Sequence, residues 1–249
     1  MTAHHSKGHG VHSPFVYQLI QEVLKDSSTM PSFEKIESIR KRLLKDKTVL
    51  QVDDYGAGSV TGNKKQRSIS SIAGTALKSP KYARLLFRLA HFTNAKNMIE
   101  LGTSLGITSA YMASASPDSQ LITFEGAAAV ADLAQSHFTE LQLNNIHIVK
   151  GPFDESLQNY EAPLSHDLIY IDGNHTCEAT LRYFHFFLPR THEYSLMIFD
   201  DIHWSKGMEE AWEKIKQHPS VTLTIDLFFI GLVFFRKSQL IPQHFSIRY

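Results

Sequence analysis

The stretch ELGTSLGITSAYMA, residues 100–113, holds two glycines between a short apolar run and an amphipathic segment. The apolar run NMIEL, residues 97–101, has the length and composition of a buried strand. Gly102 and Gly106 follow at the point where this strand would turn into a helix. Because glycine has no side chain, such a turn lets a ligand come close to backbone N–H groups. The stretch therefore predicts a strand–turn–helix unit with a ligand site at its turn.

After residue 97 the sequence alternates short apolar runs with amphipathic segments, a pattern typical of βαβ units on a parallel sheet. Two runs near the end lie too close together for a crossover helix, so they must pair antiparallel as a hairpin. We predict a Rossmann-like, doubly wound α/β fold of seven strands, five parallel strands and then this hairpin. The expected strands are NMIEL (97–101), LITFE (121–125), IHIVK (146–150), DLIYID (167–172), LMIFDD (196–201), VTLTIDL (221–227) and GLVFFR (231–236).

Residues 1–95 lack strand alternation and show helical spacing of apolar residues over 14–25, 32–45 and 79–92. We expect a helical N-terminal extension, residues 1–95, that caps the acceptor site, and a catalytic domain over residues 96–249. Further helices are expected at 128–143 and around Met208, Trp212 and Ile215. The stretch DDYGAGSVTGNKKQRS, residues 53–68, reads as an exposed loop.

The amino-acid composition indicates which partners and which cellular compartment to expect. Lys and Arg together number 25, and Asp and Glu together also number 25, so the formal net charge is zero. The composition therefore gives no large positive potential of the kind that would indicate a nucleic-acid partner. The longest apolar run, residues 228–235, is far shorter than a membrane span. With Cys177 as the single cysteine and no secretory signal at the start, we expect a cytoplasmic protein that acts on a small molecule. A homo-oligomer is compatible with the sequence.

The glycine-rich turn favours a ligand without phosphates. Dinucleotide enzymes usually carry G-x-G-x-x-G, whose second glycine admits a pyrophosphate, and Ser104 occupies that position here. An adenosyl ligand without phosphates would tolerate Ser104, and Glu100 offers a carboxylate to a cationic ligand. A tight turn that needs its glycines only for backbone angles is the alternative.

Two later turns extend this site. Glu125 closes the second strand 23 residues after Gly102, the spacing at which doubly wound folds place an acid on ribose hydroxyls. A carboxylate capping the next helix is the alternative for Glu125. After the third strand, Gly151 allows close approach, Phe153 can flank an adenine ring and Asp154 can accept from its amino group. For Phe153 and Asp154, packing is an equal alternative.

Together, ELGTSLG, the terminal Glu of LITFE, GPFDES, IDGNH, FDDIHW and the closing hairpin resemble a class I methyltransferase that uses S-adenosylmethionine. The likeness covers about residues 95–237 and is closest to the metal-dependent O-methyltransferases, both catechol-type enzymes and those acting on sugar hydroxyls in macrolide biosynthesis. It implies a seven-stranded sheet whose last strand is reversed. The cofactor-binding residues that it implies are Glu100, Gly102, Thr103, Ser104, Gly106, Thr108, Glu125, Gly126, Gly151, Phe153, Asp154 and Asp172.

Three carboxylates raise the question of a metal. Asp172 ends the fourth strand and Asp200-Asp201 ends the fifth, so all three lie at the carboxyl edge of a parallel sheet. Oxygen ligands in this number suit Mg²⁺ or another divalent cation, and the resemblance assigns metal binding to Asp172, Asp200 and Asp201. The catechol branch has Asp-Asn where this chain has Asp-Asp. In the alternative without a metal, Asp172 binds the methionine end of the cofactor and Asp200-Asp201 caps the next helix.

His175 follows Asp172 by three residues, where the catechol-type enzymes have a lysine base and the sugar-modifying branch a histidine. An imidazole that titrates near neutrality can accept a hydroxyl proton, so His175 is the predicted catalytic base. His203 and Trp204 either line the acceptor pocket or pack. The sequence thus predicts S-adenosylmethionine-dependent O-methylation of a small molecule. The alternatives are an NAD(P)-dependent oxidoreductase and a cofactor-binding protein without catalysis.

Overall fold

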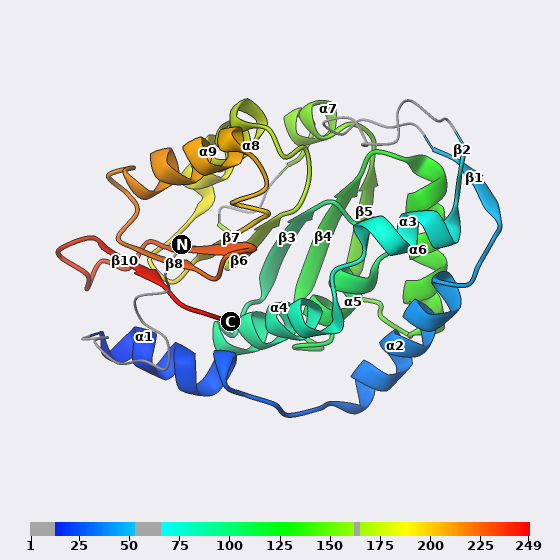
Figure 1. The fold of residues 1–249 in the computed structure, drawn as a ribbon, viewed down its shortest axis with the longest axis horizontal. Coiled ribbons are helices and arrows are strands. Elements are labelled where there is room, and N and C mark those ends of the chain that lie inside the picture. The colour runs from blue at the N-terminus through cyan, green and yellow to red at the C-terminus, as the bar shows by residue number, and fades with distance from the viewer. Residues whose placement is uncertain (1–12, 53–65, 162–164) are drawn as a thin grey trace. The chain divides into compact units, whose positions relative to one another are not determined.

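The computed structural model describes residues 13–52, 66–161 and 165–249. The chain divides into two compact units. Unit 1 comprises Met1–Asp26, Phe92–Met98 and Ala162–Tyr249, and unit 2 comprises Ser27–His91 and Ile99–Glu161. Strand β3 (Asn97–Leu101) begins in unit 1 and ends in unit 2, so both units contain part of the central sheet. Figure 1 shows the elements and their labels.

The strands of unit 2 are parallel. β4 (Gln120–Glu125) pairs with β5 (Ile146–Lys150) from Leu121 opposite Ile146 to Glu125 opposite Lys150. Because the pairing is parallel, the turns that follow both strands lie at one edge of the sheet. The helices that follow β3, β4 and β5 are α5 (Ile107–Ala113), α6 (Ala128–Glu140) and α7 (Phe153–Gln158).

The N-terminal helices of unit 2 share a core with α5 and α6. Phe33 of α2 packs edge-on against Phe87 of α4 at 4.8 Å and contacts Tyr111 of α5 at 5.0 Å between ring centroids. The Tyr111 hydroxyl donates to Glu37 Oε1 at 2.9 Å, and Arg40 Nε donates to both oxygens of that carboxylate. Burial and the neighbouring Glu37 carboxylate raise the pKa of Tyr111 to about 12. The bounds of these helices are α2 (Pro31–Leu43), α3 (Ile69–Ala76) and α4 (Pro80–Phe92).

Part of the predicted loop at residues 53–68 is regular structure. Residues 53–65 lie outside the described residues, but β2 (Gln66–Ser68) pairs antiparallel with β1 (Val49–Gln51). Helix α3 begins directly after β2, where the Ser68 side chain accepts from the N–H of Ser71. The expectation of a loop up to Ser68 was therefore wrong at its end, because three residues without apolar alternation carry no visible strand signal.

Unit 1 contains the predicted hairpin and one further strand. β6 (Leu168–Ile171) pairs parallel with β7 (Leu196–Asp200), and β9 (Ile230–Phe234) pairs antiparallel with both β7 and β8 (Leu223–Asp226). The hairpin prediction is thus confirmed. β10 (Gln243–Ser246), which the sequence analysis missed, pairs parallel with β8. The order of the large sheet is β10-β8-β9-β7-β6-β3-β4-β5.

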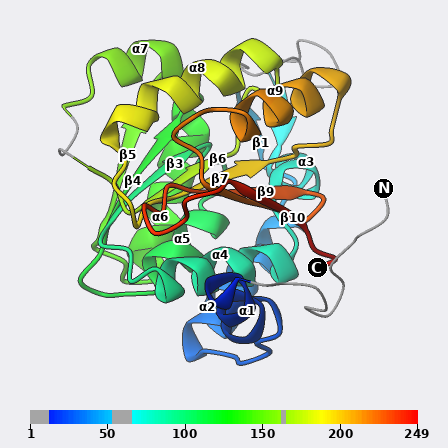
Figure 2. The same cartoon turned by 90° about the vertical axis from the view of Figure 1, so that its left-hand side faces the viewer.

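Helices cover both faces of the strands of unit 1. α8 (Cys177–Phe187) and α9 (Lys206–Lys216) lie side by side on one face, and α1 (Pro14–Leu19) lies on the other (Figures 1 and 2). Phe15 of α1 packs edge-on against Phe234 at 5.2 Å, and the Arg236 guanidinium lies 3.9 Å from the Phe15 ring centroid. The expected single helix over 14–25 is an α-helix to Leu19 and then a π-helical segment, Ile20–Leu24. In unit 1 a 3-10 turn, Leu188–Arg190, follows α8.

The predicted α/β fold is confirmed by this mostly parallel sheet with helices on its faces. The bounds of β3 and β5 agree with the predicted residue ranges, and those of the other predicted strands differ by one or two residues at one or both ends. The boundary near residue 95 between an extension and a catalytic domain stays a prediction. Within the described residues, no helix is both long enough and apolar enough to span a membrane.

The close contact between Gly231 and Trp212 yields a test of packing in unit 1. A Cβ at Gly231 would lie 2.7 Å from two ring atoms of the buried Trp212 and 3.1 Å from Ile202 Cγ2. We expect Gly231→Ala to lower the free energy of unfolding by about 1–3 kcal/mol. Gly74→Ala is the control, because nothing lies within 4 Å of a Cβ there, and it should stabilise helix α3 by about 0.5–1 kcal/mol. Equal shifts in urea midpoint for the two variants would contradict this account.

Candidate functional site

The glycine-rich turn of unit 2 is held in a left-handed conformation. The φ angles are 106° at Gly102, 47° at Ser104 and 80° at Gly106. The carbonyl oxygen of Phe124 accepts from the N–H groups of Gly102 at 3.0 Å and Thr103 at 3.1 Å. These two N–H donors are therefore engaged within the turn, and ligand binding at this turn stays a prediction.

Gly106 is required by both its backbone angle and its surroundings. Its N–H donates to the Thr103 carbonyl at 2.9 Å, and a Cβ there would lie 2.6 Å from Phe138 Cε1 and 3.2 Å from Ala134 Cβ. Phe138 and Ala134 belong to α6. The glycine therefore lets α6 pack directly against the turn.

Glu125, the last residue of β4, connects two turns at this edge. Its Oε2 accepts from the N–H of Ser104 at 2.8 Å, and its Oε1 accepts from the N–H of Ala127 at 2.9 Å. Burial raises the pKa of Glu125, while the N–H donors, Gly126 among them, lower it in part. Since Ala127 is the N-cap of α6, the carboxylate does occupy the helix start. Each carboxylate oxygen has a second lone pair that can still accept from a ligand.

Glu100 is fully buried and faces inward. Its Oε1 accepts from the Thr108 hydroxyl at 2.6 Å, and its Oε2 accepts from the Thr123 hydroxyl at 2.7 Å and from the Ser109 hydroxyl. Thr103 adds a hydroxyl contact to Thr123 at 2.6 Å. Contact of Glu100 with a cationic ligand, directly or through water, stays a prediction. Thr123 and Ser109 were not predicted as partners of Glu100. Their position in apolar, buried segments of the sequence is the feature that could have indicated a buried hydrogen-bond partner.

The third turn of unit 2 borders a cavity of about 330 Å³. Gly151, with φ 128°, lines it, and the N–H of Gly151 donates to the Glu125 carbonyl at 2.9 Å. Phe153 and Asp154 are not among the lining residues; Phe153 is half-buried, and Asp154 is exposed on the first turn of α7. The structure therefore places Gly151 beside Glu125 and directs Asp154 toward solvent.

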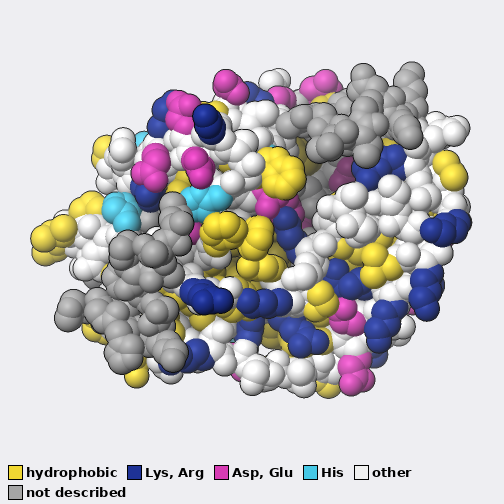
Figure 3. All heavy atoms as spheres, in the orientation of Figure 1, with side chains coloured by type: hydrophobic (Ala, Val, Ile, Leu, Met, Phe, Trp, Pro, Cys, Tyr) yellow, Lys and Arg dark blue, Asp and Glu magenta, His cyan; other side chains and the backbone are white. Residues whose placement is uncertain are grey.

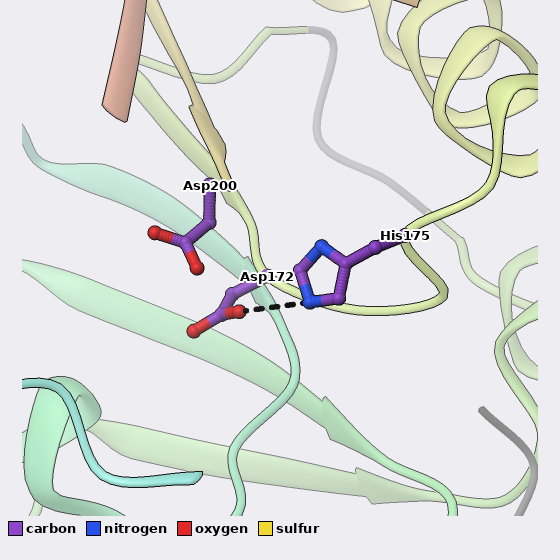
Figure 4. A group of neighbouring side chains, drawn as sticks. All are labelled: Asp172, His175 and Asp200. Atoms are coloured by element: carbon purple, nitrogen blue, oxygen red, sulfur yellow. Dashed lines mark ion pairs between the residues drawn. The ribbon is translucent and has the colours of Figure 1, made fainter. Parts of the chain in front are cut away.

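In unit 1, Asp172, His175 and Asp200 converge at one edge of the sheet. One ligand atom from each lies within 4.8 Å of the others, and Figure 4 shows the three side chains turned toward one another. Asp172 directly follows β6 and Asp200 ends β7. Since these strands are parallel neighbours, the two carboxylates emerge side by side.

The group differs from the one expected, which was Asp172, Asp200 and Asp201. His175, and not Asp201, is the third member of the group. Its Nε2 lies 3.6 Å from Asp172 Oδ1 and 3.9 Å from Asp201 Oδ2. Asp201 has a φ of 53°, so the chain turns sharply after β7. Tyr170 donates its hydroxyl to Asp172 Oδ2 at 2.9 Å, a contact not foreseen from the sequence. Two carboxylates and one imidazole form a set that can bind a divalent cation or carry a proton.

Residues 99–202 match the model of a protein family described as a methyltransferase domain. The matched segment contains the glycine-rich turn, Glu125 and the Asp172, His175 and Asp200 group. Comparison with curated proteins gives no match.

Solved structures with the same fold are O-methyltransferases and other methyltransferases. The O-methyltransferase from Bacillus cereus in complex with SAH is 20% identical, with a TM-score of 0.61 over 88% of this chain and 97% of that one. TomG from Streptomyces achromogenes, an O-methyltransferase involved in tomaymycin synthesis and solved with SAM, is 17% identical, with a TM-score of 0.61 over 89% and 95%. The SAH-bound methyltransferase from Podospora anserina is 12% identical, with a TM-score of 0.62 over 91% and 97%.

The buried carboxylate of Glu100 yields a test of the turn. Glu100→Gln replaces an acceptor oxygen with an amide NH₂ that meets hydroxyl groups, so we expect the free energy of unfolding to fall by about 1–3 kcal/mol. Glu155→Gln, at an exposed position of α7, makes the same chemical change and should stay within about 0.5 kcal/mol of the parent. Urea denaturation measures both, and an unchanged midpoint for Glu100→Gln would show that the hydroxyl contacts contribute little.

Proposed function

We propose that this chain, whose residues 99–202 match a methyltransferase domain, transfers a methyl group from S-adenosylmethionine to a hydroxyl oxygen of a small molecule. The observation that carries the proposal is the convergence of Asp172, His175 and Asp200 within that segment. Two carboxylates and an imidazole at the carboxyl ends of adjacent parallel strands suit the binding and deprotonation of a hydroxyl. The cofactors bound to the structural neighbours support the choice of methyl donor.

Unit 2 would hold the cofactor. Glu125 has acceptor capacity for the ribose hydroxyls, and its two contacts to backbone N–H groups fix the direction of its carboxylate. The turn from Gly102 to Thr108 would meet the methionine portion, with Thr103 and Ser104 as its polar side chains. Gly126, Gly151, Phe153 and Asp154 would lie toward the adenine. Glu100 would act indirectly, by holding Thr108 in α5.

Unit 1 would prepare the acceptor. His175 Nε2 would take the hydroxyl proton, and Asp172 at 3.6 Å and Asp201 at 3.9 Å would stabilise the imidazolium that forms. S-adenosylmethionine, when bound, would supply the methyl group: the acceptor oxygen would bond to the methyl carbon as the bond from sulfur to that carbon breaks, with its electron pair left on sulfur. Position and deprotonation are the main contributions asked of the protein.

The residues of unit 1 also fit a divalent cation, because carboxylate oxygens are ligands for Mg²⁺ and Mn²⁺ and a neutral imidazole is a ligand for transition metals such as Zn²⁺ or Fe²⁺. Asp172 and Asp200 would hold the ion, with His175 or Asp201 completing the protein ligands. A bound cation would lower the pKa of the acceptor hydroxyl. Tyr170 would orient Asp172 through its hydrogen bond to Oδ2.

Cofactor binding provides the first test of the proposal. Glu125→Gln should weaken S-adenosylmethionine binding about tenfold to hundredfold in isothermal titration, because hydrogen bonds to a charged acceptor are lost. Burial holds the pKa of Glu125 above the ordinary value of 4.5. The affinity of the parent should therefore fall as pH decreases through that raised pKa, while the variant shows no such fall.

Asp118→Asn, which makes the same carboxylate-to-amide change at an exposed position before β4, is the control for this titration and should bind as the parent does. A parent protein that ignores S-adenosylmethionine and its demethylated product at millimolar concentration, or that binds reduced nicotinamide dinucleotide instead, would rule out the proposed activity.

Ion binding provides the second test. We expect Asp172→Asn and Asp200→Asn each to raise the dissociation constant for Mn²⁺ at least about tenfold, because a carboxylate ligand becomes a neutral amide. Electron paramagnetic resonance of free Mn²⁺ measures this directly. Asp118→Asn, at an exposed position of unit 2, should leave binding unchanged. If the parent fails to bind Mn²⁺ or Mg²⁺ at millimolar concentration, the metal role is excluded and the proton-transfer role of His175 stands alone.

A further inference from the structure

The zero formal net charge of the chain includes two opposite excesses of charge in unit 2. Residues 27–91, which contain α2, α3, most of α4 and the β1–β2 pair, have 13 Lys and Arg against five Asp and Glu. Residues 99–161, the rest of unit 2, have one Lys against eight Asp and Glu. The N-terminal part of unit 2 therefore has an excess of eight positive charges, and such a local excess favours an anionic partner.

Four exposed cations of this part lie together in residues 41–49, which we call the basic segment. They are Lys41, Arg42, Lys45 and Lys47, and Asp46 is the one acidic residue among them. Figure 3 shows Lys and Arg side chains on the part of the surface where Figure 1 places α2 and β1. Charges this close in sequence act together on a partner, because the Debye length is about 8 Å at physiological ionic strength.

Hydrogen bonds fix the backbone of the basic segment between α2 and β1. The Asp46 side chain accepts from the N–H of Thr48 at 2.8 Å. The carbonyl oxygens of Asp46 and Thr48 accept from the N–H groups of Ser70 at 2.7 Å and Ile69 at 2.9 Å, at the start of α3. The one acidic side chain of the segment is thus used in its turn, and the lysines project from a backbone that is held in place.

Two aliphatic side chains are exposed among these cations. Val49 is 57% exposed and Leu44 46%, the highest fractions of any large apolar side chain that the structure describes in unit 2. Aliphatic side chains of this kind enter the boundary between headgroups and acyl chains when a protein lies on a bilayer. The stems of neighbouring lysines can lie along the same apolar layer while their ammonium groups stay among the headgroups. The basic segment therefore has both components of a lipid-binding surface.

The same residues fit a nucleic acid less well. Both ends of the Arg42 guanidinium are engaged by Glu140, with Nη1 3.0 Å from Oε1 and Nη2 2.5 Å from Oε2. The large apolar side chains exposed in the described part of unit 2 are aliphatic or Met, and none of them is aromatic. Surfaces that bind single-stranded RNA stack its bases on aromatic rings or on free guanidinium groups. A lipid surface is therefore the better match.

We propose that the basic segment binds the surface of a bilayer that contains anionic phospholipids. The ammonium groups of Lys41, Lys45 and Lys47 contact the phosphate and carboxylate groups of the lipids, and Leu44 and Val49 enter the interfacial layer. The binding is peripheral and reversible, because a few cations and two aliphatic side chains bind far more weakly than a membrane-spanning helix. The proposal goes beyond the proposed function and does not depend on it.

Vesicle sedimentation with the full chain tests the proposal. One set of vesicles consists of phosphatidylcholine alone, and the other also contains phosphatidylserine. We expect the partition coefficient of the parent protein to be at least about tenfold higher for the anionic vesicles. Raising NaCl from about 0.1 M to about 0.5 M should remove most of this preference, because the Debye length shortens. Equal partition into both sets would overturn the proposal.

Two variants locate the binding on the basic segment. Lys45→Gln/Lys47→Gln should lower partition into the anionic vesicles about 25-fold, because each basic residue near such a surface contributes about fivefold. Leu44→Ser should lower it about threefold or more, because an apolar side chain no longer enters the interface. All the exchanged residues are exposed, so the urea midpoint should stay at that of the parent. Undiminished partition of both variants would contradict the proposal.

Lys25→Gln/Lys237→Gln is the matched control. It makes the same change in net charge at two exposed positions of unit 1, and it should partition as the parent does. A decrease equal to that of Lys45→Gln/Lys47→Gln would show that total charge, and not the basic segment, governs the binding, and this result would also overturn the proposal.

Two further measurements test the other occupants of this surface. A labelled single-stranded RNA should bind more weakly than the anionic vesicles, and Leu44→Ser should not change its affinity. If the RNA binds through Lys45 and Lys47 while the vesicles do not capture the parent, the partner is a nucleic acid and the proposal is wrong. It is equally wrong if sedimentation velocity shows a dimer that Lys45→Gln/Lys47→Gln dissociates while the vesicles capture nothing, since a second copy of the chain then covers the segment.

Discussion

The parallel register of β6 against β7 is the constraint on which the chemistry of unit 1 depends. Ile171 lies opposite Phe199 in that pairing, so the next residue of each strand, Asp172 and Asp200, leaves the sheet beside the other. Both strands are fully buried, and a slip by one residue would turn every side chain to the opposite face of the sheet. The core residues of β6 and β7 thus fix the spacing of the two carboxyl groups. His175 Nε2 lies 3.6 Å from the first of them, Asp172 Oδ1.

Unit 2 uses two acidic residues at the same edge in different ways. Glu100 is enclosed by hydroxyl donors from α5 and β4, so its carboxyl group links these two elements. Glu125 accepts two backbone N–H groups and remains partly accessible. Its raised pKa reflects burial that these donors do not fully offset. The first carboxylate therefore organises the turn, and the second remains suited to a ligand.

Most of the fold was predictable because the strands are visible in the sequence as short apolar runs. NMIEL and IHIVK are apolar runs bounded by turn residues, and β3 and β5 have the bounds that these runs predict. The hairpin followed from the short distance between its two strands. β10 was missed because Gln243 and His244 give no apolar alternation, and its position depends on pairing with β8. The π-helical end of the first helix likewise has no signal in apolar spacing.

The site was predictable only at the level of strand ends. Asp172, Asp200 and Glu125 could be placed because each closes a predicted strand, and parallel strands end at a common edge. Which atoms meet there could not be read from the sequence. The hydroxyl contacts of Glu100, the pairing of His203 with Asp226 and the nearness of His175 to Asp172 join residues through tertiary packing. The roles assigned to these residues stay predictions.

The polar contact between α2 and α5 limits which N-terminal segments can be exchanged between related proteins. Glu37 binds both Arg40 and Tyr111, so an N-terminal helix is tied to the helix that follows the glycine-rich turn. A recombined protein that received residues 27–91 from a relative without Glu37 would leave Tyr111 with its hydroxyl buried and this acceptor gone. Exchange of this segment, in evolution or in the laboratory, therefore requires either an acceptor at position 37 or a matching substitution at position 111.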